Sequence, residues 1–154
     1  MENGRGSSNG VLRVSHLNIV ARDVDRLAEF YRRVFGCQDL RPPRELSGKA
    51  VDRGIGLRGA KIRSVWLSLP GAVDMFLELF EFAAYEDRPA GSANSAGYAH
   101  VAFEVEDLQA AHEGILQAGG SALGEVTNLG SDETPYFAVY MRDPEGNIIE
   151  LEGR

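Results

Sequence analysis

The spacing of hydrophobic residues changes between positions 12 and 36. Residues 12–21 carry aliphatic side chains at alternate positions, which predicts a strand. From Val24 onward hydrophobic residues return every three or four positions, as on the buried side of a helix. Asp23 directly before this stretch is typical of a helix N-cap, and Gly36 directly after it is typical of a helix end. A strand followed by a helix is therefore expected here.

The same pattern returns 84 positions later. A histidine, an aspartate seven residues on and a glycine twenty residues on occur in both halves of the chain: His16, Asp23 and Gly36, then His100, Asp107 and Gly120. This repeat predicts two copies of one unit, joined near the small residues at 90–97. Neither half has enough chain to bury a core alone, so we expect the two units to pack together.

Extended segments follow each helix and are separated by turn residues. In the first half they are a loosely defined segment after Cys37 and residues 61–69 and 74–82, with a turn at Pro70-Gly71. In the second half they are residues 121–127, 136–142 and 147–152, with a turn at 143–146. The pattern predicts an α+β fold of two tandem βαβββ modules. We expect a disordered tail (1–10) before a single domain (11–154) of module one (11–82), a linker (83–97) and module two (98–152).

Composition restricts the function classes. The chain of 154 residues is 44% hydrophobic and 25% charged, as in globular proteins, and its net charge of −7 excludes a typical nucleic-acid binder or a polybasic membrane-surface protein. No run of 18 apolar residues occurs, and the first ten residues lack the hydrophobic stretch of a signal peptide, so we expect a cytoplasmic protein. The single cysteine, Cys37, excludes an internal disulfide.

Residue parity places two histidines and two glutamates on the strand faces that point away from the helices. These residues are His16, Glu78, His100 and Glu150. A lone strand histidine or carboxylate is commonly structural or solvated, but here both types recur at equivalent places in both modules. Two imidazoles and two carboxylates that converge in a cavity predict a divalent-metal site.

This arrangement resembles the vicinal oxygen chelate superfamily, which includes glyoxalase I, methylmalonyl-CoA epimerase, extradiol dioxygenases and bleomycin-resistance proteins. The residues that carry the resemblance are His16 with Asp23 and Phe30-Tyr31, Leu77-Glu78-Leu79, His100 with Asp107, and the closing stretch 143–151. The resemblance implies a curved eight-stranded sheet around a metal cup, one divalent ion per site (Zn, Ni, Co, Mn or Fe, left open) and a homodimer. Whether the modules pair within one chain or across a dimer also stays open.

The resemblance implies proton abstraction α to a carbonyl by an isomerase, lyase or epimerase, with Glu150 or Glu78 as the base. Glu45 is a weaker second candidate for the base. An extradiol-type Fe(II) dioxygenase is an alternative, but its usual ligand set is two histidines and one carboxylate, and Glu78 would be a fourth ligand. A non-enzymatic antibiotic-binding protein is another alternative, although such a binder has no need of all four ligand-type residues.

The substrate is expected to be a small molecule with adjacent oxygens. Candidate contacts are Trp66, Phe76, Tyr136, Tyr140 and Arg53, together with the loops expected at 41–60 and 126–135. Residues 41–63 contain seven basic and two acidic side chains, a local net charge of +5 against −12 for the rest of the chain. This stretch is either a solvated basic surface or an attractor for an anionic substrate, such as a carboxylate or a CoA- or glutathione-like tail.

Overall fold

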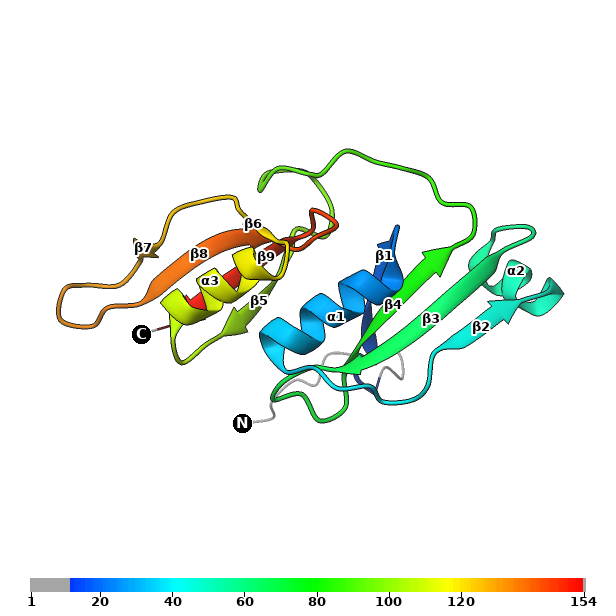
Figure 1. Ribbon diagram of the computed structural model, residues 1–154, viewed down its shortest axis with the longest axis horizontal. Coiled ribbons are helices and arrows are strands. Elements are labelled where there is room, and N and C mark those ends of the chain that lie inside the picture. Colours follow the sequence, from blue (N-terminus) through cyan, green and yellow to red (C-terminus); the bar gives the residue numbers. More distant parts are fainter. Residues whose placement is uncertain (1–11, 154) are drawn as a thin grey trace, which may run out of the picture.

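Two sheets, each with a long helix against one face, make up the computed structural model, which describes residues 12–153 (Figure 1). The first half contains β1 (His16–Ala21), α1 (Val24–Phe35), β2 (Arg44–Ser47), α2 (Lys49–Ile55), β3 (Lys61–Ser68) and β4 (Phe76–Phe82). The second half contains β5 (His100–Glu104), α3 (Leu108–Gln117), β6 (Ser121–Ala122), β7 (Thr127–Asn128), β8 (Phe137–Arg142) and β9 (Ile148–Gly153). The strand orders are β1-β4-β3-β2 and β5-β9-β8-β6, with β7 paired to β8. The predicted α+β fold of two βαβββ modules is confirmed, as two sheets of four and five strands.

The caps of the two long helices agree with the sequence pattern. The Asp23 side chain accepts a hydrogen bond from the Arg26 amide at 2.9 Å, and Asp107 accepts one from the Ala110 amide at 2.9 Å. Gly36 ends α1 in the left-handed conformation, with φ 67°. The predicted tail at 1–10 lies outside the described residues. Within the described chain, no helix or strand lies between β4 and β5, where the linker (83–97) is predicted.

The expected loop at 41–60 is wrong, because it contains β2 and α2. The helix α2 has no buried residue, so it leaves no hydrophobic period in the sequence. Asp52 fixes the turn that follows, since its carboxylate accepts hydrogen bonds from the amides of Gly59 and Ala60 at 2.8 and 3.0 Å. The hydrophobic pattern therefore could not predict this short exposed helix.

The strand expected at 121–127 is also wrong in its extent, because it is broken into β6 and β7. The amides of Leu123 and Gly124 both donate to the Tyr140 carbonyl, each at 3.0 Å. Two residues opposite one partner form a bulge, which interrupts the ladder between the two short strands. The second expected loop, at 126–135, likewise contains β7.

The two modules pack through their helices. α1 and α3 lie side by side on the same side of the molecule (Figure 1). The rings of Phe35 and Phe103 stack with centroids 3.9 Å apart, and the buried Tyr31 hydroxyl donates to Asp143 at 3.0 Å. Burial raises the pKa of both Tyr31 and Asp143, so the phenol stays protonated and remains a donor. One core therefore extends across both modules.

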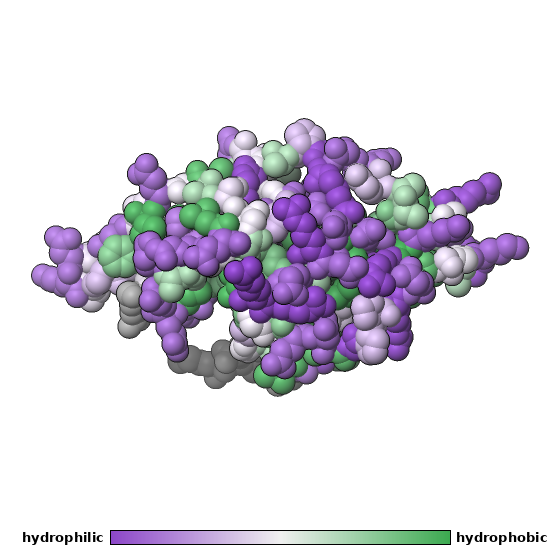
Figure 2. Space-filling view, viewed as in Figure 1, coloured by the Kyte–Doolittle hydropathy of each residue, from purple (hydrophilic) through white to green (hydrophobic). Residues whose placement is uncertain are grey.

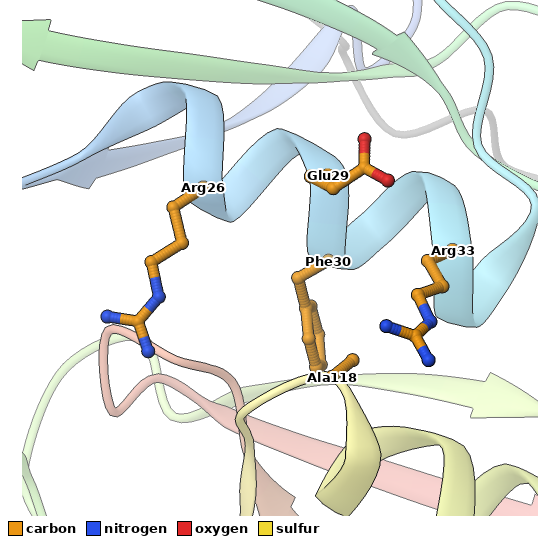
Figure 3. Close-up of a pocket in the computed structure, with 5 residues that line it drawn as sticks. All are labelled: Arg26, Glu29, Phe30, Arg33 and Ala118. Carbon is orange, nitrogen blue, oxygen red and sulfur yellow. The ribbon is translucent and has the colours of Figure 1, made fainter.

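The helical side of the molecule is mostly hydrophilic (Figure 2). A pocket of ≈ 150 Å³ lies there between α1 and the end of α3, where Phe30 points at Ala118 and Arg26 and Arg33 extend from α1 (Figure 3). This pocket belongs to the contact between the modules and not to the faces that carry the predicted metal ligands. Among the described residues, no helix has the length and hydrophobicity to span a bilayer.

Candidate metal centre

In module one, His16 and Glu78 form a pair on the sheet face opposite α1. They lie on the parallel neighbours β1 and β4, and His16 Nε2 is 3.3 Å from Glu78 Oε2. Asn18 Nδ2 donates to the same oxygen at 3.2 Å, and Trp66 Nε1 donates to Glu78 Oε1 at 2.8 Å. The Glu78 carboxylate is therefore held from three sides and is buried.

In module two, His100 and Glu150 form the equivalent pair on β5 and β9. His100 Nε2 is 3.0 Å from Glu150 Oε2. The strand neighbours of Glu150 are Ala102 and Tyr140, at the places that Asn18 and Trp66 hold beside Glu78. Tyr140 packs its ring against His100, with centroids 5.0 Å apart. Among the described residues, Glu150 has no hydrogen-bond or ion-pair partner besides His100.

Each pair has the geometry of two ligands of one cation. Bonds of roughly 2.1 Å that meet at a right angle bring ligand atoms to about 3 Å from each other, close to the separations found in both pairs. In module one the other ring nitrogen, His16 Nδ1, lies 3.2 Å from the Ser15 hydroxyl, which leaves Nε2 directed at Glu78. Imidazole nitrogen with carboxylate oxygen suits Zn, Ni, Co, Mn or Fe. The donor set therefore fits a divalent ion.

One chain presents these ligands as two pairs. Within residues 12–153, no three side chains among His, Cys, Asp and Glu gather at a point that could hold an ion. The two modules contact each other through α1 and α3. The sheet faces opposite these helices, which carry the pairs, therefore stay open to solvent. The His16 side chain is 41% exposed and that of His100 is 30% exposed. A single centre built from all four residues stays a prediction.

The predicted substrate contacts are not all close to the pairs. Phe76 lies between His16 and Trp66, with ring centroids 5.1 and 4.3 Å away, and Tyr140 packs on His100. Tyr136 directly precedes β8, and a side-chain hydrogen bond with Glu152 on β9 raises the pKa of its phenol. Arg53 is different: it is exposed on α2, beyond the edge strand β2.

The strand neighbours give the two faces opposite charge. On module one, Arg44 pairs with Ser64, and the Arg41 guanidinium donates to the Ser64 hydroxyl at 3.1 Å. On module two, Glu104 and Glu152 are paired neighbours on the face that carries Glu150. Arg41 and Arg44 thus add positive charge to the face of module one, and Glu104 and Glu152 add negative charge to that of module two. Arg41 was missed by the sequence analysis as an individual site residue, because nothing in the sequence places its side chain over β3.

The family model of the Glyoxalase/Bleomycin resistance protein/Dioxygenase superfamily matches residues 13–151, which include both modules. The chain belongs to this superfamily. It is 27% identical over 146 residues to the ethylmalonyl-CoA/methylmalonyl-CoA epimerase of Cereibacter sphaeroides, across 91% of this chain and 96% of that protein.

Solved structures share the superfamily's fold. A glyoxalase family protein from Bacillus cereus has a TM-score of 0.84 and 23% identity, over 96% of this chain and 97% of that one. A mutant of glyoxalase I from Zea mays has a TM-score of 0.65 and 21% identity, over 92% of this chain and 45% of that one. The Bacillus cereus alignment covers both modules at once, so the placement of one module against the other is common to both proteins.

Proposed function

We propose that the protein is a divalent-metal-dependent enzyme that removes a proton α to a carbonyl, as an epimerase, isomerase or lyase. The observation that carries this proposal is the repeated histidine–glutamate pair, with donor atoms 3.3 Å apart in one module and 3.0 Å apart in the other. Superfamily membership and the similarity to a protein named as an epimerase support it.

Two copies of the chain would complete each centre. Because one chain offers two separate pairs, the four ligands meet only if module one of one copy faces module two of another. The basic face with Arg41 and Arg44 and the acidic face with Glu104 and Glu152 are complementary in this arrangement. A two-fold axis then generates two equivalent centres per dimer.

The ion would be held by His16, Glu78, His100 and Glu150. When bound, it supplies a Lewis acid that favours negative charge on two adjacent substrate oxygens. Four protein ligands leave about two of six octahedral positions for the substrate. The aromatic side chains Trp66, Phe76 and Tyr140 border the pairs, and in the proposed dimer they would shield the reacting carbon from water.

Glu150 is the base in this proposal. The Glu78 carboxylate is held by Asn18, Trp66 and His16, and these contacts oppose its movement off the metal. Glu150 Oε1 accepts no hydrogen bond from the described residues, so this atom is free to take the substrate proton. Return of the proton to the neighbouring carbon isomerises the substrate, and delivery to the opposite face of the same carbon epimerises it.

Glu45 does not suit the role of base. It pairs with Arg63 at 3.3 Å, and Arg63 also contacts Asp25 on α1. These contacts place Glu45 at the helical side of the sheet, away from Glu78. The structure therefore favours the two paired glutamates over Glu45.

Metal content and proton exchange test the proposed function together. Bound metal is removed with a chelator, and separate samples are reloaded with Zn, Ni, Co, Mn or Fe. Each sample is then incubated in D₂O with methylmalonyl-CoA or ethylmalonyl-CoA. We expect one ion per chain, and deuterium at the α carbon only with loaded protein. Absence of both a bound ion and exchange would overturn the proposal. Oxygen consumption with Fe(II) and catechol would favour a dioxygenase instead.

A further inference from the structure

Arg41 is a cation without a carboxylate partner among the described residues. Its Cζ atom lies 3.9 Å from the centroid of the Trp66 ring, and its Nη2 donates to the Ser64 hydroxyl at 3.1 Å. The Nε and Nη1 atoms are buried and have no hydrogen-bond partner. Buried donors without acceptors are costly, typically by about 1–3 kcal/mol each. An acceptor that gains access to these donors, by a shift of the atoms that cover them, would therefore remove this cost.

Several other arginines among the described residues have acidic partners. Arg22 pairs with Asp87 and Glu145, Arg32 with Asp39, and Arg63 with Asp25 and Glu45. Burial lowers the pKa of Arg41, the nearby charge of Arg44 lowers it further, and the Glu78 carboxylate opposes this shift. The positive charge at Arg41 is thus only partly compensated, in contrast to the charges of arginines held in ion pairs.

The position of Arg41 connects it to the proposed centre. Its guanidinium covers one face of the Trp66 indole, and the N–H of the same indole donates to Glu78. The Arg41 guanidinium is therefore separated from Glu78 by the Trp66 indole alone, so a molecule bound at Glu78 and His16 would lie close to Arg41. In the proposed dimer, Glu104 and Glu152 of the other copy would repel a second negative group of that molecule and direct it toward Arg41.

We propose that Arg41 binds a carboxylate of the substrate, so that the substrate is an acid whose charged end lies against module one while its adjacent oxygens lie at the two pairs. The position of the adjacent oxygens at the two pairs rests on the proposed function. The binding of a carboxylate by Arg41 does not. A carboxylate is flat and has two acceptor atoms, which suits a planar guanidinium held in a fixed orientation by the indole.

Trp66 is the single tryptophan of the chain, so its fluorescence reports directly on Arg41. Metal-stripped full-length protein is titrated with malonate, with the uncharged analogue malonamide and with inorganic phosphate. We expect a saturable change with malonate, none with malonamide and weaker binding of phosphate. In Arg41→Met the malonate affinity should fall at least tenfold, with an intermediate loss in Arg41→Lys, which keeps the charge but not the planar fork.

Arg58→Met is the matched control, because Arg58 is an exposed arginine of the same basic stretch and lies in the turn before β3. It should bind malonate like the wild type. Circular dichroism of all variants establishes that they are folded. No saturable response in the wild type, equal affinity for phosphate, or an unchanged malonate affinity in Arg41→Met would each overturn the assignment.

The two proposals fail in different ways. Arg41-dependent malonate binding by a protein that takes up no divalent ion would refute the proposed metal centre and leave the carboxylate site intact. Metal-dependent proton exchange in a protein whose malonate affinity does not depend on Arg41 would refute the carboxylate site alone. The same preparations serve both measurements.

Discussion

The two histidine–glutamate pairs share a backbone arrangement and differ in the side chains that surround them. Each glutamate lies between a strand that carries the histidine and a strand that carries an aromatic residue. Glu78 accepts hydrogen bonds from Asn18 and Trp66, whereas the equivalent neighbours of Glu150 give it none. One fold can therefore produce a fixed carboxylate and a free carboxylate at equivalent positions. Substitutions in and around each pair test whether this difference corresponds to two chemical roles.

The largest expected effect comes from removing the histidine of one pair in one chain and the histidine of the other pair in a second chain. His16→Ala and His100→Ala homodimers should each be inactive, because every centre lacks a ligand. If module one faces module two of another copy, mixing the two variants creates dimers with one intact centre, and about a quarter of the wild-type activity returns. Activity is measured before and after subunit exchange. No recovery in verified mixed dimers would show that the ligands do not meet across chains.

Replacement of the two glutamates should give different losses. Glu150→Gln keeps an oxygen ligand but removes the base, so proton exchange should fall by about 10³-fold while the bound ion is retained. Glu78→Gln should mainly weaken metal binding, because the charge-assisted contacts with Trp66 and Asn18 are lost or reduced. Exchange rates at saturating metal, with metal affinities from dialysis, separate the outcomes. Equal effects of both variants would contradict the division of roles.

The aromatic neighbours offer a matched pair of milder changes. Trp66→Phe removes the indole donor of Glu78, and metal affinity should fall by roughly 10- to 100-fold, as for other residues that support a ligand. Tyr140→Phe should change it less than about twofold, because no hydrogen bond joins Tyr140 to Glu150 and only the hydroxyl is removed. Metal titration of both variants checks the contrast. A loss in Tyr140→Phe as large as that in Trp66→Phe would refute it.

The smallest expected effect comes from giving the second pair a feature of the first. Ala102→Asn places an amide beside Glu150, as Asn18 lies beside Glu78. The new donor should restrain Glu150 and slow proton exchange by about fivefold, the cost of roughly 1 kcal/mol for one hydrogen bond. Ala102→Ser, with its shorter side chain, is the control. A faster exchange in Ala102→Asn would indicate that Glu150 needs support rather than freedom.

Much of the fold and the paired positions could be predicted from the sequence, because strand parity and helix caps are local properties. Asp23 and Gly36 bound α1 as the pattern indicates, and Glu78 lies opposite the helical side as its parity requires. The helix α2 could not be predicted, since an exposed helix needs no hydrophobic stripe. The stacking of Arg41 on Trp66 also could not, because it joins a residue outside any strand to the middle of β3.

The stacked rings of Phe35 and Phe103 and the bond from Tyr31 to Asp143 have a further consequence. They hold α1 and α3 side by side, and in this arrangement the two histidine–glutamate pairs of one chain lie apart. In the proposed dimer, metal uptake and self-association are thermodynamically linked, so the ion should tighten the dimer by the same factor as dimerisation tightens metal binding. Dilution should dissociate the dimer and release the ion in the same transition. The thermal stability of the metal-loaded protein should rise with protein concentration.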